Sequence, residues 1–277
     1  MECKIIADSC CDLTHELEEK LGVTHIPLTM RLGDKEFSDD KNLDLEGFMT
    51  EMKACKEKVS SAAPAPHFFQ NAIEKAKQSF VITLSEKLSG SYNSAIAGKE
   101  LAEENGAASA HVIDSKSAAA GEALVAIKLW ELMQNGMAEN VIIQTINRFI
   151  DDMKTYFLLE SYDNLQKNGR MSKVSGAIAT ILNIKLLMGS DGNGSIALVS
   201  KQRGINKAID KIVSLIKESG RKIEGENLVI SHCNNPDLAE RLTDAIRRLY
   251  NFKEIFIIPM RGLSSMYADD KGIVLAF

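Results

Sequence analysis

The chain has 277 residues, of which 45% are hydrophobic and 26% charged, a composition typical of folded globular proteins. Its formal net charge is −5, so it lacks the basic excess typical of nucleic-acid-binding proteins, and we expect no nucleic-acid partner. No apolar run is long enough to cross a bilayer, so we expect no membrane span. The length allows one large domain or two ordinary ones.

The cysteines and histidines indicate neither a disulfide framework nor a metal site. The five cysteines are odd in number, and none has the CxxC spacing of zinc ligands. The five histidines share no metal-ligand spacing. We therefore expect no metal and no other cofactor. Unpaired thiols are typical of the reducing cytosol, so we expect a cytoplasmic protein.

The first half of the chain alternates short apolar runs with amphipathic stretches. We predict strands at Cys3–Ala7, His25–Met30, Lys35–Phe37, Phe80–Leu84 and Ala110–Ile113, and helices at His15–Leu21, Phe68–Gln78, Ser91–Asn105, Ala118–Gln134 and Glu139–Lys154. Continuous apolar strands joined by helices are typical of a parallel sheet covered on both faces. The pattern predicts an N-terminal three-layer α/β/α domain with a mainly parallel sheet, over residues 1–155.

The second half begins a new series of elements. We predict strands at Tyr156–Glu160, Lys185–Gly189, Ser195–Lys201, Leu228–His232, Ile255–Pro259 and Ile273–Phe277, and helices at Ser175–Leu182, Ile205–Lys217 and Pro236–Tyr250. Asp191-Gly-Asn-Gly between two apolar runs is a strong hairpin signal, which implies antiparallel pairing. Residues 156–277 are therefore predicted to form an α+β domain with a mixed sheet.

Nucleotide-binding and catalytic signatures are absent from the sequence. Neither the Gly-Lys-Ser/Thr of a P-loop nor a GxSxG or HExxH motif occurs. A loose GxGxxA match at Gly192–Ala197 lies between two predicted strands, where a hairpin turn is the simpler interpretation.

Segments rich in serine and aspartate follow predicted strands or precede predicted helices, at Asp8–Leu13, Ser60–Pro66, Leu84–Ser94 and Asp114–Ser117. Serine and aspartate are favoured helix N-caps, which alone would account for any one of these segments. Ser89-Gly90-Ser91 fits capping less well, because a glycine lets backbone N–H groups approach an anion at a helix N-terminus. This segment predicts a site for a carboxylate or a phosphate.

These segments, taken in order, resemble the DegV family of fatty-acid-binding proteins. The family pattern runs Asp-Ser-Thr-x-Asp-Leu, Thr-Ser-Gln-Pro-Ser-Pro, Leu-Ser-Gly-Thr-Tyr-x-Ser-Ala, Val-Ile-Asp-Ser-x-x, Gly-Arg-Ile-Ser-Lys and Leu-Asn-Ile-Lys-Pro. The matching segments here are Asp8–Leu13, Ser61–Pro66, Leu88–Ala95, Val112–Ser117, Gly169–Lys173 and Leu182–Leu186. Lys201-Gln-Arg-Gly and Ser231-His232 match later family motifs, so the resemblance covers essentially the whole chain.

The resemblance implies a two-domain α/β protein that holds one long-chain fatty acid between its domains and has no catalytic residue of its own. The carried-over carboxylate-binding residues are Ser61, Ser89, Gly90 and Ser91, with Ser9 as a further candidate. An apolar tunnel would hold the tail, and its candidate lining residues are Ile178, Ile181, Leu182, Leu186, Leu187 and Met188. Each of these, taken singly, also fits an ordinary core.

Some family members present their fatty acid to a separate kinase, which makes an acyl phosphate. Arg170 and Arg203 match family arginines of that docking surface, although both also fit a solvated surface position. The family's C-terminal Gly-Thr-His-Thr-Gly-Pro-Gly is replaced here by a segment without its histidine, in which Ser264, Ser265 or Tyr267 would supply the donor. The second motif also lacks its glutamine. The missing histidine bears on the kinase step more than on lipid binding.

The leading prediction is a monomeric fatty-acid carrier that is not an enzyme. The alternative from another class is a hydrolase or phosphotransferase that acts at the same cleft through Ser89 or Asp114, with His232 as the only candidate base. A third alternative is a sensor of small anions with a short tunnel, which would show no preference for chain length.

Overall fold

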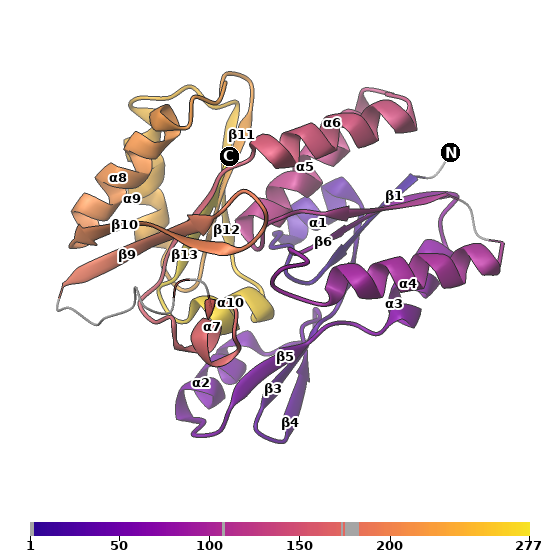
Figure 1. Ribbon diagram of the computed structural model, residues 1–277, viewed down its shortest axis with the longest axis horizontal. Coiled ribbons are helices and arrows are strands. Elements are labelled where there is room, and N and C mark those ends of the chain that lie inside the picture. Colours follow the sequence, from indigo (N-terminus) through magenta and orange to yellow (C-terminus); the bar gives the residue numbers. More distant parts are fainter. Residues whose placement is uncertain (1–2, 107–108, 173, 175–182) are drawn as a thin grey trace.

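The computed structural model describes residues 3–106, 109–172, 174 and 183–277 (Figure 1). Its N-terminal part contains a four-stranded sheet in the order β2-β1-β6-β7, in which every pairing is parallel. The strands are β1 (Cys3–Asp8), β2 (Val23–Ile26), β6 (Gln78–Thr83) and β7 (Ala110–Asp114). The predicted parallel sheet is confirmed.

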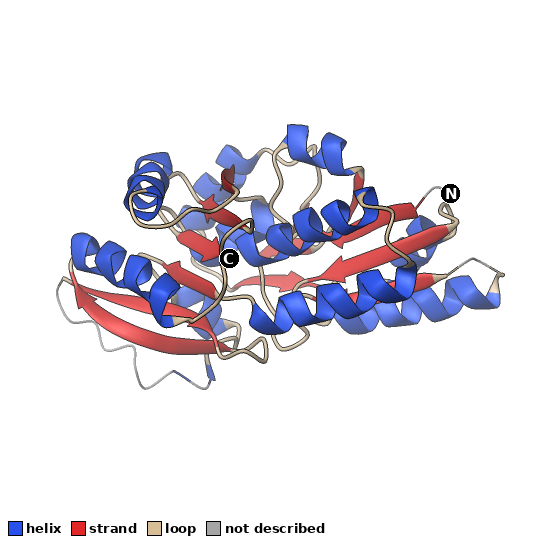
Figure 2. Cartoon of the chain, turned by 90° about the horizontal axis from the view of Figure 1, so that it is seen from above, coloured by secondary structure: helices blue, strands red, loops and turns tan. Residues whose placement is uncertain are grey.

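Helices cover both faces of this sheet (Figure 2). They are α1 (His15–Leu21), α3 (Pro66–Ile73), α4 (Ser91–Glu104), α5 (Ala120–Gln134) and α6 (Glu139–Asp152). Successive residues of a strand point to opposite faces. Accordingly, Ile6 of β1 packs in a cluster with Phe69 of α3 and Ala95 of α4, whereas Ile5 packs with Leu124 of α5. The predicted three-layer α/β/α arrangement is confirmed.

A small antiparallel sheet in the order β4-β3-β5 lies beside this domain. It contains β3 (Thr29–Leu32), β4 (Lys35–Ser38) and β5 (Val59–Ala62), and helix α2 (Leu45–Ala54) connects β4 to β5. The prediction of one strand at His25–Met30 is wrong, because Pro27 has no N–H and separates β2 from β3, which belong to different sheets. The predicted helix Phe68–Gln78 is too long, because Gln78 pairs with Cys3 at the start of β6.

The C-terminal part contains a six-stranded mixed sheet in the order β10-β9-β8-β13-β11-β12. Its strands are β8 (Thr155–Leu158), β9 (Ile184–Ser190), β10 (Ile196–Arg203), β11 (Asn227–His232), β12 (Glu254–Pro259) and β13 (Ile273–Ala276). The predicted hairpin joins β9 and β10, and Asp191 Oδ1 accepts hydrogen bonds from the N–H groups of Asn193 and Ser195. Gly192 and Gly194 have φ of 85° and 84°, a conformation that favours glycine.

Helices α8 (Ile205–Glu218) and α9 (Pro236–Arg247) cover one face of the second sheet. Helix α5 packs on the other face, since Leu124 shares a hydrophobic cluster with Val229 of β11 and Ala276 of β13. One core therefore joins the two larger sheets. Two short helices, α7 (Asp163–Lys167) and α10 (Gly262–Ala268), were not predicted. The helix predicted at 175–182 lies outside the described residues.

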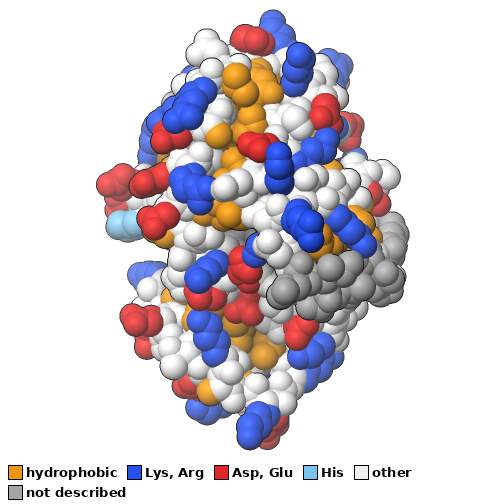
Figure 3. Space-filling model, turned by 90° about the vertical axis from the view of Figure 1, so that its left-hand side faces the viewer, with side chains coloured by type: hydrophobic (Ala, Val, Ile, Leu, Met, Phe, Trp, Pro, Cys, Tyr) orange, Lys and Arg blue, Asp and Glu red, His pale blue; other side chains and the backbone are white. Residues whose placement is uncertain are grey.

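Positive and negative side chains are mixed on one face of the molecule. On the face shown in Figure 3, lysines and arginines are interspersed with acidic side chains, without a continuous basic stripe among the residues drawn in colour. Within the described ranges, no helix is both long enough and apolar enough to span a bilayer.

Candidate functional site

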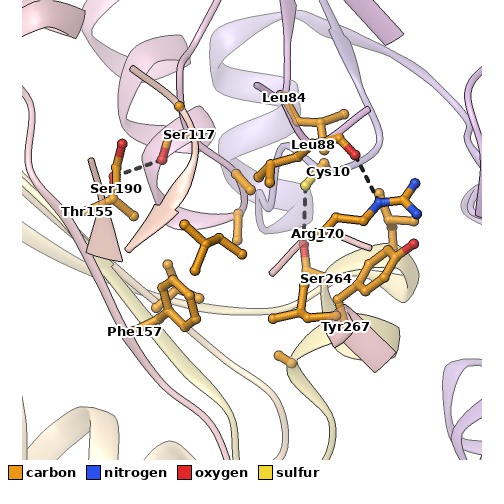
Figure 4. Close-up of a pocket in the computed structure, with 18 of the residues that line it drawn as sticks. Cys10, Leu84, Leu88, Ser117, Thr155, Phe157, Arg170, Ser190, Ser264 and Tyr267 are labelled. Atoms are coloured by element: carbon orange, nitrogen blue, oxygen red, sulfur yellow. Dashed lines mark hydrogen bonds between the residues drawn. The ribbon is translucent and has the colours of Figure 1, made fainter. Parts of the chain in front are cut away.

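An apolar cavity lies at the carboxyl edge of the N-terminal sheet and faces the C-terminal sheet (Figure 4). Cys10, Leu84 and Ala118 line it from the segments after β1, β6 and β7. The carboxyl edge of a parallel sheet is where α/β proteins place their ligands. The empty space, which includes open solvent at its mouth, is about 800 Å³.

The opposite wall is built by the C-terminal half. Phe157 of β8 and Val274 of β13 are directly paired across the strands and so point to the same face. Both line the cavity, together with Ile196 of β10 and with Met260 and Leu263 around the start of α10. The hydrophobic cluster around the cavity contains residues from both halves of the chain. The site therefore exists only when the two sheets are together.

One end of the cavity is polar. Tyr267 lines it, and the tyrosine hydroxyl lies 2.8 Å from Ser61 Oγ. Arg170 also lines this end, with its guanidinium 5.8 Å from the centre of the Tyr267 ring. Arg170 Nε donates to Leu88 O at 3.1 Å, and Nη1 donates to Asn168 O. Neither acceptor is a carboxylate, so the guanidinium charge is not neutralised by these bonds.

The Ser89-Gly90-Ser91 segment lies near the end of β5, and neither it nor Ser61 is among the residues that line the cavity. A Cβ on Gly90 would be 3.7 Å from the Cβ of Ala63. The Ser91 hydroxyl donates to Asp8 Oδ2 at 2.6 Å, and the Ser91 N–H donates to Ser89 Oγ at 3.2 Å. The Ser91 hydroxyl therefore helps to hold the segment after β6 against β1 and is not free to bind a ligand. The Ser89 O–H and the Gly90 N–H are the remaining donors of this segment, and neither donates a hydrogen bond to an acceptor among the described residues.

Buried carboxylates fix the segments that carry these groups. Asp8 also accepts from the N–H groups of Cys10 and Leu84, at 3.1 and 3.0 Å. Asp39 accepts from Gly262 and Leu263 N–H, at 2.9 and 3.0 Å, and so holds the first turn of α10. Burial raises the pKa of Asp8 to about 6, despite these hydrogen bonds, and also raises that of Asp39. The sequence pattern gave no signal for Asp39.

The other predicted donors lie around the cavity in different ways. Ser264 lines it, with its Oγ 3.8 Å from Cys10 Sγ. Ser9 is fully buried and accepts from Leu28 N–H at 3.1 Å, so it supports the chain between β2 and β3. Ser265 is directed to the backbone, with Oγ 3.4 Å from Met260 O. Of the predicted replacements for the family histidine, Tyr267 is the one that reaches Ser61.

The predicted tail-lining residues are only partly described. Leu186 and Met188 of β9 are buried in the cluster that surrounds the cavity, behind its surface. Leu187 points to the opposite face of the sheet. Ile178, Ile181 and Leu182 lie outside the described residues. The apolar walls include Phe157, Ile196 and Val274. The only sequence signal for these residues was the alternation of side chains along a strand, which shows the face on which a residue lies.

The remaining predicted residues, Arg203 and His232, do not line the cavity. Arg203, at the end of β10, is exposed. His232 lines a different groove, between α2 and the start of α9, and its Nδ1 accepts from Asn235 N–H at 3.3 Å. Three hydroxyl residues that were not predicted as site residues, Ser117, Thr155 and Ser190, line the far end of the cavity. In the part of the chain that the structure describes, no cluster of His, Cys, Asp and Glu could hold a metal ion.

Comparison with known proteins gives consistent results. The chain matches the family model "Uncharacterised protein, DegV family" over residues 2–276. It is 34% identical over 281 residues to a DegV domain-containing protein of Streptococcus pyogenes serotype M1, which covers 100% of this chain and 99% of that protein.

Two solved structures share the whole fold. A DegV family protein from Ruminococcus gnavus, refined with vaccenic acid, has a TM-score of 0.94 at 33% identity and covers 99% of each chain. The Streptococcus pneumoniae Fatty Acid Kinase (Fak) B3 protein, loaded with linoleic acid, has a TM-score of 0.90 at 33% identity and covers 100% of this chain and 99% of that one. The family model and the relatives match from end to end, and this protein therefore belongs to the DegV family.

Proposed function

We propose that this protein binds one long-chain fatty acid, with the carboxylate at the Arg170–Tyr267 end of the cavity and the tail along its apolar walls. The observation that carries the proposal is the presence, in one cavity, of mainly apolar walls and, at one end, of Arg170 beside Tyr267, whose hydroxyl lies 2.8 Å from Ser61 Oγ. A carboxylate on a long hydrocarbon chain is the ligand chemistry that uses both features.

The two parts of the ligand make different contributions. Each buried methylene contributes about 0.8 kcal/mol, so the contribution of the tail to the affinity grows with its buried length. Arg170, Ser61, Tyr267 and the Ser89-Gly90 donors fix the direction in which the molecule enters, because a carboxylate is favoured beside a guanidinium and hydroxyl donors.

The proposed role is that of a cytoplasmic, monomeric carrier that presents its fatty acid to a separate fatty acid kinase. The pneumococcal protein of similar structure is named as a component of such a kinase system. Arg170 lies at the carboxylate end, and the exposed Arg203 offers a second cation on the surface. These two arginines are the proposed contacts of the kinase.

The enzyme alternative finds less support in the geometry. A serine hydrolase needs a base within hydrogen-bond reach of its nucleophile. The candidate base His232 lines a groove whose walls include neither Ser89 nor Asp114, and its Nδ1 is engaged by Asn235. The small-anion alternative leaves the apolar walls without a role.

The test is to extract the protein purified under native conditions and to identify the released molecules by mass spectrometry. We expect about one long-chain fatty acid per protein, and a marked loss of it in a Ser61→Ala/Ser89→Ala double variant. Ser60→Ala is the matched control, because Ser60 is the neighbour of Ser61 on β5. An empty protein that also fails to take up added oleate or palmitate would contradict the proposal.

A further inference from the structure

The end of the cavity opposite Arg170 contains hydroxyl groups that a plain acyl tail does not use. Ser117 follows β7 and Thr155 begins β8, and their hydroxyl oxygens lie 2.8 Å apart. Both residues line the cavity, and they are only 4% and 8% exposed. Figure 4 shows this pair, with Ser190, on the other side of the cavity from Arg170 and Tyr267.

One hydroxyl proton of the Ser117–Thr155 pair has no acceptor among the described residues. Two hydroxyls have two protons to donate, and the bond between them uses one. The hydroxyl that accepts therefore keeps its own O–H, and the described residues offer it no acceptor. The neighbouring Ser115 does not change this, because it bonds the backbone of Ser117, accepting from N–H at 3.2 Å and donating to O at 3.3 Å.

A plain hydrocarbon tail would leave this donor unsatisfied. A buried polar group without a partner is destabilising, whereas valine has the shape of threonine, suits a strand and carries no such cost. A ligand with an oxygen substituent at this depth would complete the network, because its oxygen can accept the free proton. The ligand's own O–H can donate to a lone pair of either hydroxyl.

We propose that Ser117 and Thr155 form a subsite for a hydroxyl group on the distal part of the acyl chain, and that hydroxylated long-chain fatty acids are ligands of this protein. The inference rests on the proposed function, since it places the carboxylate at the Arg170 end. It adds a second polar anchor to that site, at the far end of the apolar walls.

The experiment compares hydroxylated acids with their plain parents on delipidated protein by calorimetric titration. The pairs are 12-hydroxystearate with stearate, and 16-hydroxypalmitate with palmitate, so that two depths along the chain are sampled. At least one hydroxylated acid is expected to bind no more weakly than its parent. Thr155→Val should weaken that acid about 3- to 10-fold, the value of one hydrogen bond, and leave its parent within about twofold.

Ser117→Ala should act in the same direction, which guards against a folding defect of the strand variant. Thr243→Val is the matched control, because Thr243 is a buried threonine of α9 that does not line the cavity. This variant should bind the hydroxylated acid and its parent with unchanged affinity. Equal effects on plain and hydroxylated acids in both variants, or weaker binding of both hydroxylated acids to the unmodified protein, would overturn the subsite and leave fatty-acid binding intact. Failure of the unmodified protein to bind stearate and palmitate would instead overturn the proposed function, and the subsite with it.

Discussion

The hydroxyl groups of Ser61 and Tyr267 lie 2.8 Å apart, although 206 positions separate the two residues in the sequence. Ser61 is on β5, an edge strand of the small sheet, and Tyr267 is on α10, whose first turn is held by Asp39. The polar end of the cavity is therefore built where the small sheet meets the C-terminal half. Arg170 completes it from the segment after α7.

Removal of the Tyr267 hydroxyl tests the role of this pair. Tyr267→Phe keeps the ring beside Arg170 but leaves Ser61 without its partner, so we expect oleate to bind about 3- to 10-fold more weakly. Isothermal titration of the delipidated protein measures the change. Tyr250→Phe, which removes a hydroxyl bonded to Val213 O far from the cavity, should leave the affinity unchanged. Equal affinities for the Tyr267 variant and the unmodified protein would show that the Ser61–Tyr267 pair does not bind the carboxylate.

The charge of Arg170 should matter only for a charged ligand. Replacement by glutamine in Arg170→Gln removes a charge-assisted contact, which we expect to weaken oleate binding about 10- to 100-fold. Binding of oleyl alcohol should change much less, because the alcohol has no carboxylate. Arg203→Gln is the control, since Arg203 is exposed and does not line the cavity. A parallel loss for acid and alcohol would show that Arg170 acts through packing.

Filling the apolar wall should select against long chains. Val274 lines the cavity beside its cross-strand neighbour Phe157, so Val274→Phe places a ring where the tail is proposed to lie. We expect binding of an 18-carbon acid to weaken at least tenfold relative to a 10-carbon acid, because only the longer tail needs the filled space. Val141→Phe on the exposed surface of α6 is the control. Unchanged relative affinities would place the tail elsewhere.

Stability should depend on pH through Glu122. This residue of α5 is fully buried, and burial, together with the charges of Asp8 and Asp12, raises its pKa well above its usual range. Near neutral pH, folding therefore requires Glu122 to take up a proton that the unfolded chain lacks. The contribution of Glu122 to the free energy of unfolding is complete at pH values below the pKa that Glu122 has in the unfolded chain. This contribution declines as the pH rises above that value.

Glu122→Gln removes this proton uptake. We expect the thermal midpoint of the variant to exceed that of the unmodified protein, by a margin that grows as the pH rises above the ordinary pKa range of a glutamate. Burial raises the pKa of Asp8 to about 6 and that of Asp12 to about 7. These two groups therefore make the stability of both the variant and the unmodified protein fall as the pH rises. A margin that is constant with pH, or that shrinks, would show that Glu122 is ionised in the folded protein.

The sequence predicted the elements whose signals are local. The hairpin between β9 and β10 followed from Asp191-Gly-Asn-Gly, where glycines take positive φ. The parallel sheet followed from its continuous apolar strands. The small sheet was missed in part because β5 (Val59–Ala62) is short and half polar, and because Pro27 divides an apparently continuous strand.

The candidate site was predicted as a set of polar segments and of apolar residues between 178 and 188, whereas the wall residues Phe157 and Val274 were not predicted. The Ser61, Ser89 and Tyr267 positions came from family motifs and from what replaces them. Phe157 and Val274 are indistinguishable in sequence from core residues, since only the packing of β8 against β13 shows that their shared face borders empty space. The partnership of Ser117 with Thr155 is likewise a product of folding, which brings the end of β7 to the start of β8.

The most direct test of the central claim is a crystal structure of the protein with a fatty acid that carries bromine on its terminal carbon. The account predicts anomalous density for the bromine inside the cavity, beyond Phe157 on the side of Ser117 and Thr155. It also predicts the carboxylate within hydrogen-bond distance of Ser61 or Tyr267. Bromine at the Arg170 end, or a ligand outside this cavity, would contradict it.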